Sequence, residues 1–169
     1  MPVSSPAGVP AQSTSRLLEN SGKAWVRKFP TSKRVDDLEP IFRSSVKRFL
    51  GALADADVAI TISATRRPRQ RAYLASLAAA REMVSGYQIG TLRVAPSLTS
   101  LHMEGQAIDM TLRWDGEINI EDAAGKTVTI RSLPRSGINP DLIKVGATYG
   151  VRHLIAVNKD PPHWSVNGH

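Results

Sequence analysis

Between residues 40 and 53 the apolar side chains recur at steps of three and four residues. This spacing places them on one face of an α-helix that begins at Pro40 and presents the basic residues between them mainly to water. The apolar positions are Ile41, Phe42, Val46, Phe49, Leu50 and Leu53. The pattern predicts a helix that covers a hydrophobic core.

Four shorter segments have the extended pattern of β-strands. In the longest of them, apolar residues at 108, 110 and 112 alternate with polar or small ones, so the apolar side chains face the core and Asp109 lies on the opposite face. Turn-forming pairs at residues 115–116 and 124–125 precede the third segment. The four segments are residues 58–63, 105–114, 127–131 and 163–166.

Two further helices are expected from their end signals. Pro68 opens a segment rich in Ala, Leu and Arg that ends near Gly86. Asn139 caps a second helix, which starts at Pro140 and is terminated by Gly150. Helices and strands are therefore interleaved, with the strands crowded into the second half of the chain, and this order predicts the α+β fold class.

The length of 169 residues, with a hydrophobic content of 41%, corresponds to one globular domain. Residues 1–22 are rich in Ser, Pro, Ala and Gly, so we expect a flexible arm or linker there and a single domain over residues 23–169. Residues 1–15 have neither a basic start nor a long apolar stretch, and we expect no Sec signal peptide. No apolar run approaches the roughly 18 residues of a membrane-spanning helix, so no membrane span is expected.

The chain is basic, with a formal net charge of +7 and a pI near 10.1. This charge favours an anionic partner, which could be nucleic acid, a membrane surface or the polymers of a bacterial wall. An arginine-rich run at residues 66–71 could be interpreted as a nucleic-acid patch. Because aromatic residues make up only 5% of the chain, there is little on which bases could stack, and no nucleic-acid partner is expected.

The candidate chemistry lies in histidines and carboxylates, because the chain has no cysteine and thiolate zinc sites are therefore excluded. His102 precedes the strand that carries Asp109, and His163 follows Asp160 and two prolines at the edge of another extended stretch. Two histidines and one aspartate make a three-ligand set, which leaves the fourth position of a tetrahedral Zn²⁺ open for water. Asp160 is then either the catalytic base or a turn residue before the prolines.

The pattern Ser-x-His-x-x-Gly-x-Ala-x-Asp, matched from Ser100 to Asp109, is followed far downstream by acid-x-x-His and preceded by Arg-x-Pro. Over about residues 58–166 this combination resembles the M15-type zinc peptidases, which include VanY-like D,D-carboxypeptidases and phage L-alanyl-D-glutamate endopeptidases. Hedgehog signalling domains share that fold. The resemblance implies a small α+β domain in which an antiparallel sheet carries the metal site and helices pack against it.

The resemblance also implies a role for each site residue. His102, Asp109 and His163 would bind Zn²⁺, and Asp160 would be the catalytic acid and base. Arg66 lies where the family has a substrate-binding arginine, with Arg67 as the adjacent possibility. Ser100 would lie near the substrate, although a role as a loop cap is equally consistent with its position. Of the remaining histidines, we expect His153 to be a packing residue and His169, the last residue, to be mobile.

The implied activity is hydrolysis of an amide bond in the stem peptide of peptidoglycan. An aspartate at position 160 resembles the phage endopeptidases and favours cleavage of the L-alanyl-D-glutamate bond, whereas Ser165 replaces the glutamate of the His-aromatic-Glu ending found in several of them. One alternative is a D,D-carboxypeptidase that removes terminal D-alanine. The other is a non-catalytic module that binds wall polymer or nucleic acid on the same scaffold.

Delivery to the wall would not use the Sec pathway. A phage lysis enzyme (an endolysin), a virion-associated enzyme and an antibacterial effector injected by a secretion system all fit this expectation. The site of action would be the bacterial cell wall, reached from the periplasm or from outside the cell. The expected partners besides the stem peptides are a delivery machinery and an immunity or inhibitor protein.

Overall fold

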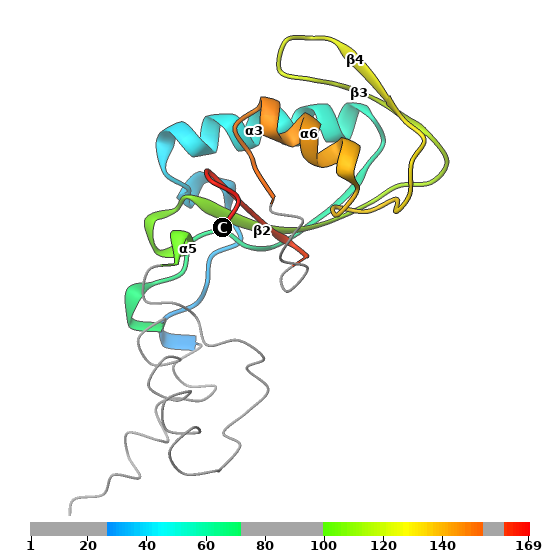
Figure 1. Cartoon of the computed structure of the whole chain (residues 1–169). Helices are drawn as coiled ribbons and strands as arrows, with labels where there is room; N and C mark the ends of the chain where they lie inside the picture. The colour runs from blue at the N-terminus through cyan, green and yellow to red at the C-terminus, as the bar shows by residue number, and fades with distance from the viewer. Residues whose placement is uncertain (1–26, 72–99, 154–160) are drawn as a thin grey trace, which may run out of the picture.

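The computed structural model describes residues 27–71, 100–153 and 161–169 (Figure 1). Within these ranges helices are interleaved with strands that pair antiparallel, which confirms the α+β class. In chain order the elements are η1 (Val35–Asp37), α3 (Pro40–Asp55), β1 (Ala59–Ala64), α5 (Leu101–Glu104), β2 (Ala107–Arg113), β3 (Ile118–Glu121), β4 (Thr127–Ile130), α6 (Pro140–Thr148) and β5 (His163–Ser165).

Strand β2 is the centre of a three-stranded antiparallel sheet in the order β1-β2-β5. Its first three residues pair with β5, so that Asp109 lies directly opposite His163. On its other side β2 pairs with β1, and the register shifts between Ile62 and Ala64 where the chain approaches Asp109. The register alone therefore makes two of the expected ligands cross-strand neighbours.

Helix α3 begins where the sequence predicts. The side chain of Glu39 accepts a hydrogen bond of 2.9 Å from the amide of Phe42, and Pro40 occupies the first turn. The buried stripe consists of Phe42, Val46, Phe49 and Leu53. Ile41 was expected on this face but is 78% exposed, because each residue advances roughly 100° around the axis and position 41 falls outside the stripe.

Helices α3 and α6 cover one face of the sheet (Figure 1). Trp164 of β5 is fully buried beneath them, and its ring centroid lies 5.6 Å from that of Phe49. A Cβ atom at Gly146 of α6 would lie 2.8 Å from the Trp164 ring, so this position needs a glycine for the helix to approach the sheet. Since side chains alternate along a strand, burial of Trp164 directs its neighbour His163 to the opposite face.

The remaining strands form a separate hairpin, in which β3 pairs with β4. The sequence predicts β4, but β3 was not among the expected strands. Its residues Ile118 and Ile120 are buried against the core while Asn119 and Glu121 are exposed. Of the helix expected to run from Pro68 to Gly86, residues beyond 71 lie outside the described ranges, as does the arm over residues 1–22. None of the helices described in the structure is long and apolar enough to cross a membrane.

Candidate metal centre

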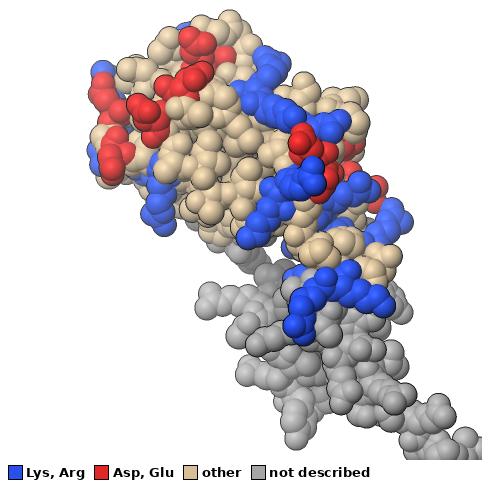
Figure 2. All heavy atoms as spheres, turned by 180° about the vertical axis from the view of Figure 1, so that it is seen from behind, with Lys and Arg blue, Asp and Glu red and all other residues tan. Residues whose placement is uncertain are grey.

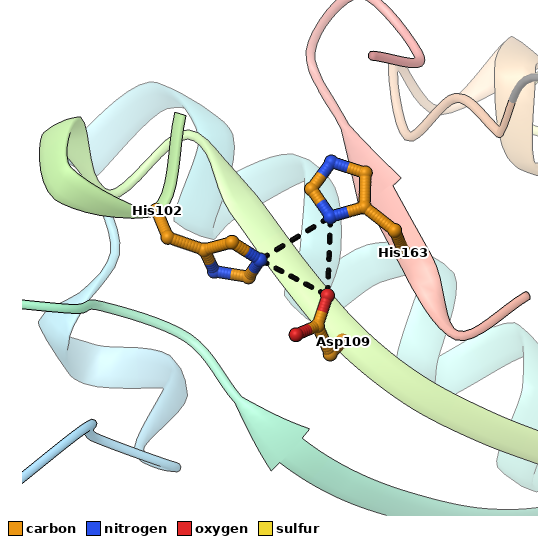
Figure 3. A group of neighbouring side chains, drawn as sticks. All are labelled: His102, Asp109 and His163. Atoms are coloured by element: carbon orange, nitrogen blue, oxygen red, sulfur yellow. Dashed lines mark hydrogen bonds and ion pairs between the residues drawn. The ribbon is translucent and has the colours of Figure 1, made fainter. Parts of the chain in front are cut away.

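Three side chains converge on one point on the face of the sheet that is turned away from helices α3 and α6 (Figure 3). Oδ1 of Asp109 lies 3.0 Å from Nε2 of His102 and 3.1 Å from Nδ1 of His163. The two histidine nitrogens are 3.2 Å apart. His102 comes from α5, Asp109 from β2 and His163 from β5, so the structure brings together all three residues that the sequence pattern selects as ligands.

The turn from α5 into β2 sets the position of His102 relative to Asp109. Gly105 ends α5 with a φ of 72°, and a Cβ atom there would lie 2.8 Å from the main-chain nitrogen of Glu39. That nitrogen donates a hydrogen bond of 2.9 Å to the carbonyl of Gly105. A glycine is required here for two reasons, the left-handed conformation and the close approach of another backbone.

In each of the two histidines, the ring nitrogen that does not face Asp109 lies within hydrogen-bond distance of a main-chain oxygen. Nδ1 of His102 lies 2.7 Å from the carbonyl of Thr65, and Nε2 of His163 lies 2.9 Å from the main-chain oxygen of His169. A main-chain oxygen only accepts hydrogen bonds, so these two ring nitrogens carry the hydrogens and donate. In a neutral imidazole the remaining nitrogen then carries a lone pair, and both lone pairs face Asp109.

This arrangement fits a bound metal ion. Two imidazole lone pairs and a carboxylate oxygen repel one another at 3.0–3.2 Å unless a cation or a proton lies between them. A tetrahedral zinc ion with bonds of about 2.0–2.1 Å separates its ligand atoms by about 3.3 Å. The spacing of the three atoms is therefore close to that of one face of a zinc tetrahedron.

The site is largely shielded from water. The side chains of His102, Asp109 and His163 are 4%, 15% and 16% exposed. Burial alone would raise the pKa of Asp109. When protons rather than a metal ion lie between the three side chains, hydrogen bonds and charge from His102 and His163 outweigh burial and hold the pKa of Asp109 well below its usual range. The Asp109 carboxylate is therefore anionic at neutral pH, as a metal ligand would need to be.

Arg66 and Arg67 follow Thr65, whose main-chain oxygen accepts the hydrogen bond from His102. The carbonyl of Arg66 accepts a hydrogen bond of 2.8 Å from the amide of Ser32, and the amide of Arg67 donates one of 3.0 Å to the carbonyl of His102. Both arginines line a cavity of about 480 Å³ that Met103 of α5 also borders. None of the three candidate ligands is among the described residues that line this cavity.

Positive charge accumulates in this region. Partial burial and the charge of Arg67 lower the pKa of Arg71, while Arg69 forms an ion pair of 2.6 Å with Glu104. On the face turned away from Figure 1, Lys and Arg side chains gather along one side with some Asp and Glu among them, and a further group of Asp and Glu lies at the opposite end (Figure 2). An anionic ligand would therefore meet a favourable potential on the arginine-bearing side.

The other expected site residues have different outcomes. Ser100 occupies the N-cap position of α5, but its side chain makes no capping hydrogen bond. Asp160 lies outside the described residues, so its role stays a prediction. His153 is buried, with its ring centroid 5.1 Å from that of Trp164, in agreement with the expected packing role.

Sequence reasoning missed the two main-chain oxygens that contact the candidate ligands His102 and His163. Thr65 and His169 contribute through main-chain oxygens, which every residue type possesses, so no residue pattern identifies them. His169 was set aside as a mobile residue, yet its main-chain oxygen contacts His163.

Comparisons with known proteins give structural similarity without sequence similarity. No protein-family model matches the chain, and no curated protein matches it significantly.

The solved structures that are similar to it include two peptidases. A mutant of the vancomycin-resistance D,D-pentapeptidase VanY from a VanB-type cassette, in complex with Zn(II), has 16% identity and a TM-score of 0.39, over 76% of this chain and 71% of that one. The L-Ala D-Glu endopeptidase ChiX of Serratia marcescens has 17% identity and a TM-score of 0.38, over 78% and 81% of the respective chains. Similarity at this level concerns the path of the backbone and assigns no function.

Proposed function

We propose that this protein is a zinc-dependent peptidase that hydrolyses an amide bond in the stem peptide of peptidoglycan. The observation that carries the proposal is the convergence of Nε2 of His102, Oδ1 of Asp109 and Nδ1 of His163 within 3.0–3.2 Å of one another. Three protein ligands are what a catalytic zinc site uses, since the fourth position stays open for water, whereas structural sites are usually closed by four.

The bound zinc would supply an activated water and polarise the scissile carbonyl. The chain's own residues have three tasks. His102 and His163 present neutral nitrogens, and Asp109 supplies the negative charge that offsets part of the metal's charge. Asp160, three residues before His163 in the chain, is our candidate for taking the proton of the water and delivering it to the leaving amine. The support for Asp160 is the acid-x-x-His spacing.

Arg66 is our candidate for binding a carboxylate of the stem peptide. Its guanidinium keeps its charge and can hold a carboxylate through two parallel hydrogen bonds. Support comes from the cavity that Arg66 lines with Arg67 and Arg69 next to α5. Ser100, half-buried at the start of that helix, is a second candidate for contacting the substrate.

We propose the L-alanyl-D-glutamate bond as the one that is cut, with aspartate rather than glutamate at position 160 as the support. Removal of terminal D-alanine is the alternative. The proposed setting is the bacterial wall, reached as an endolysin, as a virion-associated enzyme or as an antibacterial effector with its own immunity protein.

The test combines metal analysis with product identification. Purified protein should contain about one zinc ion per chain and should digest purified sacculi. Mass spectrometry of the products should reveal a new L-alanine carboxyl and a new D-glutamate amine, whereas free D-alanine would indicate the carboxypeptidase. A His102→Ala/His163→Ala double variant is the matched control. Zinc-loaded wild-type protein that leaves every muropeptide intact would refute the proposed function and favour a non-catalytic wall-binding module.

A further inference from the structure

We propose that the loop of residues 165–169 is a positioning device for the candidate metal ligand His163. The loop acts through the main-chain oxygen of His169, which accepts a hydrogen bond of 2.9 Å from Nε2 of His163. This inference rests on the proposed function, because it assigns the loop a role at the same metal site. The expected consequence of the contact is a higher affinity for zinc.

The loop starts from a rigid point of the fold. Ser165 is fully buried and lies in register with Ala107 of β2 on one side. On its other side its main chain exchanges hydrogen bonds of 2.8 and 2.9 Å with Arg152. The next residue, Val166, donates a hydrogen bond of 3.1 Å to the carbonyl of Gln106. The origin of the loop is thereby attached to the strand that carries Asp109.

Side chains within the loop close it into a tight turn. The hydroxyl of Ser165 accepts a hydrogen bond of 2.8 Å from the amide of Gly168. The same hydroxyl lies 3.0 Å from the main-chain oxygen of His169 and 3.2 Å from Oδ1 of Asn167, and it can donate to one of them at a time. Oδ1 of Asn167 also accepts a hydrogen bond of 3.0 Å from the amide of His169. These contacts hold the His169 oxygen in place.

Gly168 makes the turn sterically possible. Its φ is 87°, a conformation that residues with a side chain rarely adopt. It is also buried, although residues 167 and 169 on either side of it are exposed. A substitution of Gly168 by alanine would strain the turn directly before His169, whose main-chain oxygen contacts His163.

The physical effect is on the tautomer and orientation of His163. With its hydrogen held on Nε2, the neutral ring keeps the lone pair on Nδ1, which is the atom that faces Asp109 and His102. The Thr65 carbonyl does the same for His102 from the opposite ring nitrogen. Partners of this kind raise ligand basicity and fix the ring angle, and their loss typically weakens metal binding by roughly 10–100-fold.

The experiment measures zinc affinity by competition with a chromophoric chelator, together with the absorption spectrum of the Co²⁺-substituted protein. The variants are Gly168→Ala, which strains the turn, and Ser165→Ala, which removes the hydroxyl that closes it. The matched control is Gly125→Ala, because Gly125 has a similar φ of 79° and no atom within 4 Å of a new Cβ. It lies in the turn between β3 and β4, away from the site.

We expect both loop variants to bind zinc roughly 10-fold more weakly or worse, with a changed Co²⁺ spectrum, while Gly125→Ala matches the wild type. Wild-type affinity in a folded Ser165→Ala or Gly168→Ala protein would overturn the inference. So would an equal loss of affinity in Gly125→Ala, since that would reflect general strain. If Gly168→Ala does not fold, as judged by circular dichroism, Ser165→Ala decides. A wild-type protein without zinc affinity would instead refute the proposed function.

Discussion

Replacing Gly105 by alanine tests whether the backbone contact beside the metal centre shapes the site. Alanine in the left-handed conformation at a φ of 72° costs about 1–2 kcal/mol. In addition its Cβ would lie 2.8 Å from the main-chain nitrogen of Glu39, and backbone cannot rotate away as a side chain can. Crowding of this kind typically costs about 1–3 kcal/mol. The free energy of unfolding should therefore fall by about 2–5 kcal/mol, a large share of the roughly 5–15 kcal/mol of a typical domain.

Urea denaturation of the chelator-treated protein measures this loss without a contribution from metal binding. Gly116→Ala is the matched control, because its φ is 65° and nothing lies within 4 Å of the new Cβ. This control should lose only the conformational part, about 1–2 kcal/mol. Equal losses in the two variants, within about 0.5 kcal/mol, would show that the close approach of Gly105 to Glu39 does not constrain the chain.

Further predictions concern the metal and the chemistry. Alanine at His102 or His163 should remove both zinc and activity, as measured by elemental analysis and digestion of sacculi, and full zinc in the double variant would refute the site. Zinc occupancy should be lower near pH 5 than near pH 7, because protons compete for the imidazole nitrogens; a flat equilibrium-dialysis profile would contradict this. Asp160→Asn should keep zinc but lose roughly 10²–10⁴-fold in turnover, and a near wild-type rate would exclude its proton-transfer role. Arg66→Lys should lower kcat/KM on a defined stem peptide by about 1–3 kcal/mol without loss of zinc. If only the parallel Arg67→Lys variant is impaired, the carboxylate contact belongs to Arg67.

Periodic elements and the residue types of the site were predictable from the sequence. The steps of three and four residues predicted helix α3 from Pro40, and alternation along residues 105–114 placed Asp109 on the face away from the core. Both predictions succeed because burial of one face is a local property of the residue order. Strand β3 was missed because it lies between two turn-forming pairs and half of its residues are Asn and Glu, which are uncommon in strands, whereas β4 is β-branched throughout. Its pairing with β4 is what defines it.

The sequence by itself determined which side chains could bind a metal, since two histidines and an aspartate at these spacings limit the chemistry. Only the tertiary structure decided that they meet, because His163 reaches Asp109 through a cross-strand register formed over more than fifty residues of chain. It also decided which ring nitrogens face the site, through the main-chain oxygens of Thr65 and His169. Every residue has a main-chain oxygen, so the residue type does not reveal which of these oxygens contacts a histidine, and only the folded structure decides it.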